Sequence, residues 1–289
     1  MNSNLSKAKK EKNDEFYTMY DDIEKELIHY KEHFKDKVVY SNCDREESNF
    51  VKFFLDHGED WGLKEFIYSS NDFRSNESIE LLRRSDIVVT NPPFSLFREY
   101  VAQLMEYEKK FLIIGHQNAL TYKEIFPLIK NNRIWWGFNN FDNSRFTMPS
   151  EYYNGSTYQE FRDGKLYGRV SGLRWFTNLT HQKRNQMLPL YAKQSEMNFP
   201  RYDNYDGINV DSVLDIPHDY EAAIGVPITF IDKFNPAQFE IIKFRHGDDE
   251  KDLKVDGKSP YFRILIKHKL IYDEHGLVIG RREHNETNK

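Results

Sequence analysis

The sequence predicts an α/β fold in which helices cover a largely parallel sheet, followed by a smaller irregular α+β region. Three observations support this fold class. Residues Asp86 to Phe94 read Asp-Ile-Val-Val-Thr-Asn-Pro-Pro-Phe, and the β-branched run suits a strand buried on both faces of a parallel sheet. Further apolar runs alternate with helical patterns up to residue 180. After residue 180, prolines and glycines recur at short intervals, which indicates short strands and turns.

The front of the chain predicts a helix, a strand, a polar turn, a second helix and a second strand, in that order. The first strand covers 37–40 and runs into the turn Ser41-Asn42-Cys43-Asp44. The second helix ends near Gly58, and the second strand covers 65–68. The apolar residues that define the faces of the two helices are Ile23, Leu27, Tyr30, Phe34, Phe50, Val51, Phe53 and Phe54.

The strand that starts at Asp86 must stop abruptly. Pro92 and Pro93 lack backbone N–H groups and fix φ near about -65°, so they form a rigid loop at the carboxyl end of the strand, where open α/β sheets bind ligands. The amide oxygen of Asn91 and the carbonyl of Pro92 can accept hydrogen bonds from an exocyclic amine. Phe94 offers a face on which a planar base can stack. The loop therefore predicts a site for a planar amine.

The following elements continue the alternation. Ser95 is the expected N-cap of a helix, and 111–115 is the next buried strand. Residues 121–124 have capping-box spacing and predict a helix that Pro127 kinks or ends. The buried side of the helix after Ser95 is expected to carry Leu96, Phe97, Tyr100, Val101, Leu104 and Met105.

Two further strands, over 134–137 and 174–179, are expected to complete the sheet. Between them, 139–169 is rich in Asn, Tyr, Gly and Ser, which predicts a long loop or hairpin insertion near the active edge. Its aromatic residues can stack on bases, although ordinary packing is the expected role for most of them. They are Tyr152, Tyr153, Tyr158, Phe161 and Tyr167.

These patterns divide the chain into three parts. Residues 1–12 are a polar lead-in expected to be disordered, 13–180 form the main domain with the insertion 139–169, and 181–289 form the irregular region. Within that region, 263–267 predicts a strand whose charged ends face solvent.

Composition indicates a cytoplasmic protein. The chain has no apolar run near the ~18 residues of a membrane-spanning helix and no apolar core of a signal peptide. Its single cysteine, Cys43, excludes an internal disulfide and a multi-cysteine zinc site, and we expect no metal. At the end of a strand, Cys43 is expected to be a small filler rather than a nucleophile.

The Asn-Pro-Pro-Phe loop resembles the catalytic loop of S-adenosylmethionine-dependent amino-methyltransferases, which in DNA adenine methyltransferases reads Asp or Asn, Pro, Pro, then Tyr or Phe. The Phe-Tyr-Thr element at 16–18 precedes that loop, as in the gamma class. Over nearly its whole length, the chain resembles the EcoRI-type adenine-specific DNA methyltransferase family. The stretches that carry this resemblance are Asp14 to Thr18, Asn42 to Asp44, Ser48 to Phe50, Asn71 to Ser75, Asp86 to Arg98, Phe111 to Gly115, Arg174 to Leu179, Gly225 to Phe230, Asn235 to Ile242 and Arg263 to Lys267.

The resemblance implies a Rossmann-like methyltransferase sheet with a C-terminal target-recognition region, and double-stranded DNA as the substrate. It implies methyl transfer from S-adenosylmethionine to the N6 amine of a flipped adenine, within or derived from a restriction-modification system. The implied catalytic residues are Asn91, Pro92, Pro93 and Phe94. The implied cofactor residues are Phe16, Tyr17 and Thr18 over the methionine portion, Asp44 near the ribose or amino group, Asp72 and Phe73 near the adenine, and also Asn42, Cys43 and Asn91.

The chain departs from the usual methyltransferase pattern at two places. The turn after the first strand has no glycine, so backbone and cofactor must approach each other without one. After the second strand, Ser69 and Ser70 stand where an acid usually holds the ribose hydroxyls. Which residue binds the ribose is left open.

The net charge of -5 requires a local basic surface if the chain binds DNA. Residues 160–201 contain eight basic and three acidic side chains, and 171–195 contain no acid. The DNA contacts predicted from this stretch are Arg174, His181, Lys183 and Arg184.

Two alternatives remain open at this point. Asn-Pro-Pro-aromatic loops also serve other planar amines, so adenine in RNA, cytosine N4 and a protein glutamine are alternative substrates. Alternatively, the chain is a non-catalytic DNA-binding protein that retains the fold. The sequence leaves open the recognition sequence, a companion restriction enzyme and the oligomeric state.

Overall fold

The computed structural model describes residues 17–142, 144–148 and 159–282. The expected lead-in at 1–12, Phe16 of the Phe-Tyr-Thr element, and Tyr152, Tyr153 and Tyr158 lie outside the described residues. The chain divides into two compact units. The first comprises Met1–Ile129 and Arg133–His181, and the second comprises Lys130–Asn132 and Gln182–Lys289.

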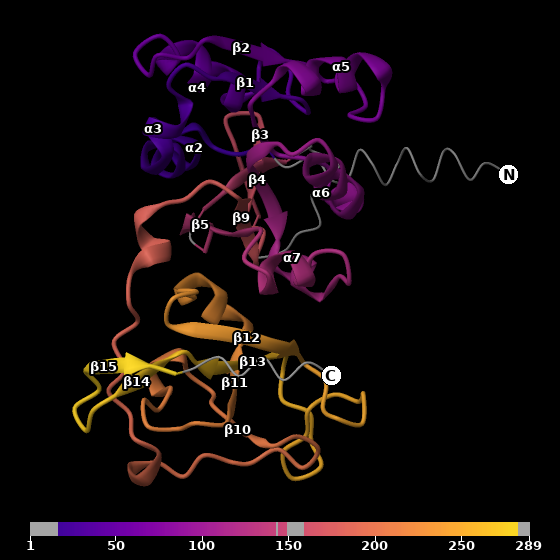
Figure 1. Ribbon diagram of the computed structural model, residues 1–289. Helices are drawn as coiled ribbons and strands as arrows, with labels where there is room; N and C mark the ends of the chain where they lie inside the picture. The colour runs from indigo at the N-terminus through magenta and orange to yellow at the C-terminus, as the bar shows by residue number, and fades with distance from the viewer. Residues whose placement is uncertain (1–16, 143, 149–158, 283–289) are drawn as a thin grey trace, which may run out of the picture. The chain divides into compact units, whose positions relative to one another are not determined.

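The first unit is built on a six-stranded sheet with the order β2-β1-β3-β4-β9-β5 (Figure 1). The first four strands in this order are parallel, β9 is antiparallel to both of its neighbours, and β5 therefore runs parallel to β4. The expectation that the strands near 134–137 and 174–179 complete the sheet is confirmed, since β9 and β5 are its last two strands. The strands are β1 (Val38–Ser41), β2 (Glu65–Tyr68), β3 (Ile87–Thr90), β4 (Lys110–His116), β5 (Trp135–Asn140) and β9 (Leu173–Thr177).

The order of the strands reverses beside β1. This strand pairs with β2 on one side and with β3 on the other, so the chain leaves β1 in one direction and returns on its opposite side. The hydroxyl of Ser41 donates a 2.7 Å hydrogen bond to the carbonyl oxygen of Val89, which joins the carboxyl ends of the two strands. In open α/β sheets, the crevice at such a reversal is where ligands bind.

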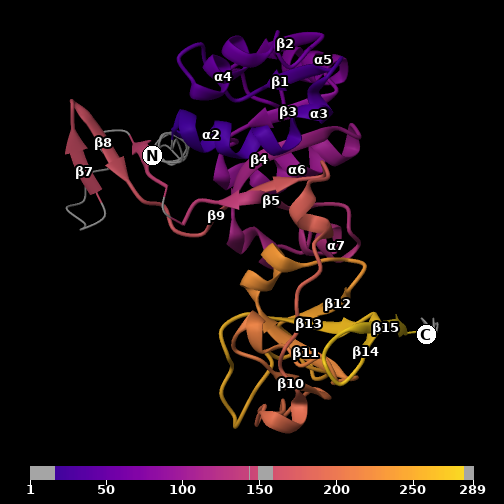
Figure 2. The same cartoon turned by 90° about the vertical axis from the view of Figure 1, so that its left-hand side faces the viewer.

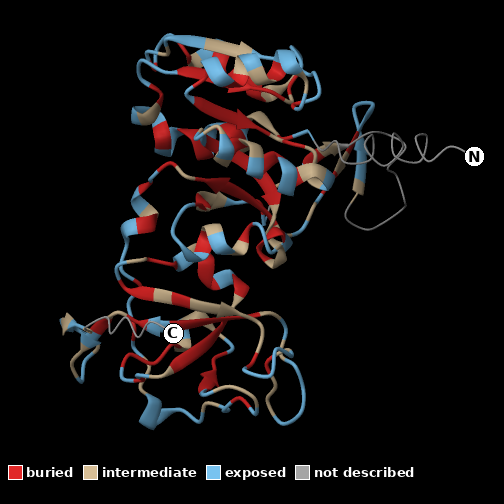
Figure 3. Ribbon diagram, turned by 45° about the vertical axis from the view of Figure 1, so that its right-hand side comes forward, coloured by how far each residue is buried: buried red, intermediate tan, exposed pale blue. Residues whose placement is uncertain are grey.

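Helices cover both faces of this sheet. Trp175 and Phe176 are neighbours on β9, so their side chains point to opposite faces of the sheet. Trp175 packs in the core cluster that includes residues of α2, α3 and α4. On the other face, the ring of Phe176 lies 5.1 Å from that of Phe97 on α6. Strands β1, β3 and β9 are buried throughout, as Figure 3 shows in red for the inner strands, whereas the edge strand β2 is partly exposed. No helix within the described ranges is both long and apolar enough to cross a membrane. The helices are α2 (Tyr20–Leu27), α3 (Lys31–Phe34), α4 (Asn49–His57), α5 (Asn76–Arg84) and α6 (Phe97–Glu106).

Two predicted helix starts were wrong. Ser95 lies inside a 3-10 turn, Phe94–Leu96, and α6 begins after it at Phe97 with no side-chain cap. The hydroxyl of Thr121 donates to the carbonyl of Asn118 at the end of another 3-10 turn, so it caps no helix. The next helix, α7 (Phe126–Lys130), has Pro127 in its first turn, where a missing N–H is tolerated.

The insertion forms a three-stranded antiparallel sheet with the order β6-β8-β7. Its strands are β6 (Phe146–Met148), β7 (Gln159–Arg162) and β8 (Lys165–Gly168). Tyr17 pairs with Thr147 through backbone hydrogen bonds of 2.9 and 3.1 Å. The insertion is thereby attached to the segment that carries the Phe-Tyr-Thr element.

The second unit holds a four-stranded sheet, β10-β11-β13-β12, and a separate hairpin of β14 and β15. Residues 182–282 contain 3-10 turns but no α-helix, so the expectation of an α+β region was wrong in its helical part. Arg263 is buried rather than solvent-facing, because β13 is an inner strand and Arg263 pairs there with Asp211 at 2.6 Å. The strands are β10 (Gly207–Asn209), β11 (Ala223–Pro227), β12 (Phe239–Phe244), β13 (Arg263–His268), β14 (Leu270–Tyr272) and β15 (Val278–Arg281).

A buried carboxylate holds the irregular part of β5. Glu26 on α2 accepts hydrogen bonds of 2.7 Å from the backbone N–H groups of both Phe138 and Asn139, and one of 2.8 Å from the Tyr30 hydroxyl. These residues lie where the pairing of β5 with β9 shifts register. Burial raises the pKa of Glu26 to about 7, although the hydrogen bonds from Asn139, Phe138 and Tyr30 favour the ionised form.

We predict that Glu26 makes the stability of the protein pH-dependent. A carboxyl group whose folded pKa is raised contributes stability that is present below its ordinary value of 4.5 and is lost as the pH rises through about 7. Between pH 5 and 8, the free energy of unfolding of the wild type should fall by up to about 3 kcal/mol relative to Glu26→Gln. Urea unfolding across this range measures the difference, and Glu24→Gln, an exposed change on the same helix, is the control. Parallel profiles for the wild type and Glu26→Gln would contradict the prediction.

Candidate active site

Three polar loops leave the carboxyl ends of neighbouring strands in the first unit. Residues 41–44 follow β1, 69–75 follow β2 and 91–94 follow β3. The backbone N–H of Asp44 donates to the carbonyl of Ser69, and that of Ser69 donates to the carbonyl of Ser41, each at 3.1 Å. The first two loops are therefore fixed to each other by their main chains.

The carboxylate of Asp44 links the first loop to the end of β3. It is buried and accepts hydrogen bonds of 2.5 Å from the hydroxyls of Ser48 and Thr90, one on each oxygen. Thr90 directly precedes Asn91. Burial raises the pKa of Asp44 to about 6, and the two hydrogen bonds act in the opposite direction. Asp44 thus holds the strand residue from which the Asn-Pro-Pro-Phe loop departs.

Two buried polar atoms in the 16–18 and 41–44 segments have no partner among the described residues. The first atom is Nδ2 of Asn42. The Oδ1 atom of the same side chain accepts a hydrogen bond from the hydroxyl of Tyr100, but Nδ2 has no partner among the described residues. The second atom is Oγ1 of Thr18, whose own carbonyl accepts a 2.8 Å hydrogen bond from Asn49 at the start of α4. Buried polar atoms in proteins are usually hydrogen-bonded, so both atoms fit a polar ligand.

Other residues of the expected cofactor pocket have partners within the protein. Asp72 makes a two-point ion pair with Arg74 at 2.9 and 2.7 Å, and this interaction lowers the pKa of Asp72. Phe73 is buried, with its ring edge-on to that of Tyr100 at 5.0 Å. Burial raises the pKa of the half-buried Cys43, which keeps it a thiol.

The place of the usual ribose-binding acid is occupied by serines. The hydroxyl of Ser69 shares a 2.7 Å hydrogen bond with that of Tyr40, and Ser70 is exposed. Tyr17, the described aromatic residue of the Phe-Tyr-Thr element, is 49% exposed.

The Asn-Pro-Pro-Phe loop is only partly accessible. Pro92 is buried, while Asn91, Pro93 and Phe94 are half-buried. The ring of Phe94 packs against the main core cluster, so only part of its surface is available for stacking.

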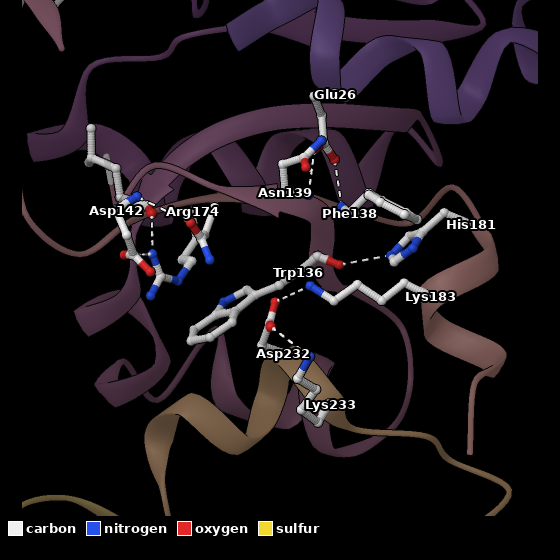
Figure 4. Close-up of polar contacts among 12 residues, drawn as sticks. Glu26, Trp136, Phe138, Asn139, Asp142, Arg174, His181, Lys183, Asp232 and Lys233 are labelled. Carbon is white, nitrogen blue, oxygen red and sulfur yellow. Dashed lines mark hydrogen bonds and ion pairs between the residues drawn. The ribbon is translucent and has the colours of Figure 1, made fainter. Parts of the chain in front are cut away.

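The structure corrects the expectation of an exposed basic face at Arg174, His181, Lys183 and Arg184. Arg174 is buried in β9 and pairs with Asp142 at 2.9 Å, and His181 is buried with a 3.0 Å hydrogen bond to the carbonyl of Trp136 (Figure 4). In the second unit, the half-buried Lys183 pairs with Asp232 at 2.6 Å. Arg184 is buried, which lowers its pKa to about 10. Side chains in these positions do not offer free cations to phosphates.

Three residues that organise the site were not predicted from the sequence: Ser48, Thr90 and Tyr100. Thr90 lies beside Asn91 in the sequence, but its bond to Asp44 spans 46 positions. Tyr100 was expected to be an apolar helix residue, although a buried tyrosine hydroxyl usually requires a hydrogen-bond partner.

The sequence profile of the family described as Adenine-specific methyltransferase EcoRI matches residues 4–71 and 67–269. The chain belongs to this family. It is 48% identical to the Type II methyltransferase M.EcoRI of Escherichia coli, over 93% of this chain and 97% of that protein. It is 37% identical to M.MpnI of Mycoplasma pneumoniae, over 92% and 98%, and 35% identical to M.MgeORF184P of Mycoplasma genitalium, over 92% and 99%.

This member of the EcoRI methyltransferase family is a site-specific DNA adenine methyltransferase of the restriction-modification type. Family membership decides against the alternatives of another planar amine and of a non-catalytic protein. A methyltransferase of this family implies S-adenosylmethionine as the methyl donor.

We predict that the hydrogen bond between Thr90 and Asp44 stabilises the site. Thr90→Val keeps the side-chain shape but removes a donor from a buried carboxylate, which should lower the free energy of unfolding by about 1–3 kcal/mol. The same change should raise the pKa of Asp44 further. Thr90→Ser retains the hydroxyl and is the matched control. Urea unfolding measures the effect, and a Val variant as stable as the Ser variant would show that this bond contributes nothing.

Proposed function

We propose that the protein moves a methyl group from S-adenosylmethionine to the exocyclic N6 amine of an adenine flipped out of double-stranded DNA. The observation that carries this proposal is the junction between the 41–44 turn and the 91–94 loop, where the bond from Thr90 to Asp44 joins them at the strand-order reversal. That strand order supports a Rossmann-like methyltransferase sheet with its ligands at this edge.

S-adenosylmethionine, when bound, supplies an electrophilic methyl group. The unpaired Nδ2 of Asn42 is a donor suited to a carboxylate, and Oγ1 of Thr18 can donate or accept. Asp44 has lone pairs beyond those that Ser48 and Thr90 use, so it can also accept from an ammonium or a hydroxyl. The proposed cofactor residues are Phe16, Tyr17, Thr18, Asn42, Cys43, Asp44, Asp72, Phe73 and Asn91.

The turn at 41–44 can approach a ligand without glycine. None of these four residues has a positive φ, so the turn uses backbone conformations that any side chain allows. The unusual sequence at this point is therefore compatible with the proposed pocket.

Catalysis in this proposal rests on Asn91, Pro92, Pro93 and Phe94. The lone pair of the adenine amine is delocalised into the ring, so the amine must be held where its nitrogen can become tetrahedral. Acceptors on Asn91 and the Pro92 carbonyl, fixed before the reaction, stabilise that geometry, while Pro93 keeps the loop rigid and Phe94 stacks on the flipped base. The amine nitrogen would take the methyl group in one direct displacement, with the thioether S-adenosylhomocysteine as the leaving group and one amine proton lost to water, so no covalent enzyme intermediate is required.

Asp44 and Thr90 act in this mechanism as positioning residues. A reacting group displaced by about 1 Å can lose a hundredfold in rate, so the residue before Asn91 must be held firmly. A buried hydroxyl bound to a buried carboxylate provides that restraint.

We assign the second unit to target recognition, acting in the cytoplasm on duplex DNA. The assignment is supported by the site specificity of the family and by exposed aromatic side chains in this unit, such as Tyr191 and Tyr261.

We predict that Asn91→Ala abolishes methyl transfer but leaves cofactor affinity nearly unchanged. Loss of a preorganised hydrogen-bonding group of this kind costs about 100- to 1000-fold in rate. Transfer is measured as N6-methyladenine in digested duplex DNA, and cofactor affinity by calorimetry. Asn131→Ala, at an exposed position after α7, is the control. Turnover near that of the wild type would contradict the assignment of Asn91.

We predict that Asn42→Ala weakens S-adenosylmethionine binding by about 5- to 150-fold, which corresponds to the loss of a buried hydrogen bond of about 1–3 kcal/mol. Tyr100→Phe removes the same internal hydrogen bond but keeps the amide, so it separates structural from binding effects. Calorimetric titration should place Tyr100→Phe much closer to the wild type than Asn42→Ala. Equal losses in the two variants would assign Asn42 a structural role only.

A further inference from the structure

The insertion arises at the same edge of the sheet as the Asn-Pro-Pro-Phe loop. Strand β5 runs parallel to β4, which is itself parallel to β3, so β5 ends at the edge where 91–94 begins. The chain leaves this edge after Asn140 and returns to it at Leu173, the residue paired with His116 at the end of β4. The three-stranded sheet between these points therefore stands at the proposed catalytic edge.

The base of this small sheet is anchored. Phe146 on β6 is buried in the main core cluster, and Leu166 on β8 is also buried. The pairing of Thr147 with Tyr17 adds a backbone attachment. The position of the sheet relative to the proposed site is thus fixed within the first unit.

The outer hairpin of the small sheet projects away from this base. Figure 2 shows β7 and β8 standing clear of β5 and β9. Asp163 and Gly164 join the two strands, and both have the positive φ that a two-residue type I′ turn requires. A Cβ added at Gly164 would meet nothing within 4 Å, so the tip reaches into open space.

The hairpin offers different chemistry on its two faces. Phe161 is 61% exposed and is paired with Leu166, which places it on one face. Arg162 is paired with Lys165 on the opposite face, where both are exposed. Arg162 lies 3.4 Å from Asp163, but that carboxylate is 82% exposed, so the ion pair holds the guanidinium weakly.

We propose that the β7–β8 hairpin contacts double-stranded DNA beside the target adenine, with Arg162 and Lys165 on phosphates and Phe161 against bases. This inference rests on the proposed function. The DNA groove must lie at the edge that receives the flipped base, and the major groove admits a two-stranded ribbon. An acidic chain approaches a polyanion through local cations, and on this projecting hairpin Arg162 and Lys165 stand opposite each other. The hairpin also carries two acids, of which Glu160 pairs with Arg145 and Asp163 lies in the turn. An exposed aromatic ring can stack on or insert between bases.

The test compares hairpin variants with matched changes on helices at the opposite edge of the six-stranded sheet. The hairpin variants are Phe161→Ala and the double change Arg162→Gln with Lys165→Gln, which retains long polar side chains. The controls are Leu55→Ala on α4, 64% exposed, and Arg83→Gln with Arg84→Gln at the end of α5, which leads into the start of β3. Affinity for a duplex with the recognition sequence is measured across salt concentrations, and cofactor affinity and Tm verify the fold.

The double hairpin change should reduce the log–log salt slope by about 1.8, since each phosphate contact contributes about 0.9. Phe161→Ala should weaken duplex binding by about tenfold or more, as loss of base stacking does. Hairpin variants that match their controls, while the wild type binds and methylates the duplex, would overturn the hairpin assignment alone. A wild type that neither binds nor methylates duplex DNA would overturn the proposed function as well.

Discussion

The proposed site depends on the buried carboxylate of Asp44 between two strands that are neighbours in the sheet but not in the sequence. Strand β1 pairs with both β2 and β3, so the loops after β1 and β3 must begin side by side. Asp44 joins them through Thr90, and Ser41 joins their strands through the carbonyl of Val89. A buried carboxylate is costly unless it is hydrogen-bonded, and this requirement makes the junction specific.

Polar groups at this edge fall into two classes. The carboxylate of Asp44 and the Oδ1 atom of Asn42 are satisfied within the protein, and they fix the geometry of the turn. The Nδ2 of Asn42 and Oγ1 of Thr18 lack partners among the described residues, and in our proposal they are the groups that meet the cofactor. The same turn would then both support the catalytic loop and hold the methyl donor.

Local sequence patterns predicted the strands and helices of the first unit because continuous β-branched runs and helical periodicity are properties of neighbouring residues. Helix starts at Ser95 and Thr121 were mispredicted because both residues belong to 3-10 turns that precede the helices. The acid-free stretch suggested a basic face, but Asp142 and Asp232, which lie outside it in the sequence, pair with its cations. The hydrogen bond from Thr90 to Asp44 could not be predicted from the sequence either, since it requires that β1 and β3 lie side by side in the sheet.

We propose that the target amine is held at the carboxyl ends of β1 and β3. The most direct measurement is a crystal structure of the protein with a non-reactive cofactor analogue and duplex DNA containing the recognition sequence. We expect an extrahelical adenine whose N6 lies about 2.7–3.2 Å from Oδ1 of Asn91 and from the carbonyl oxygen of Pro92. An adenine that remains stacked in the duplex, or whose amine meets other residues, would contradict it.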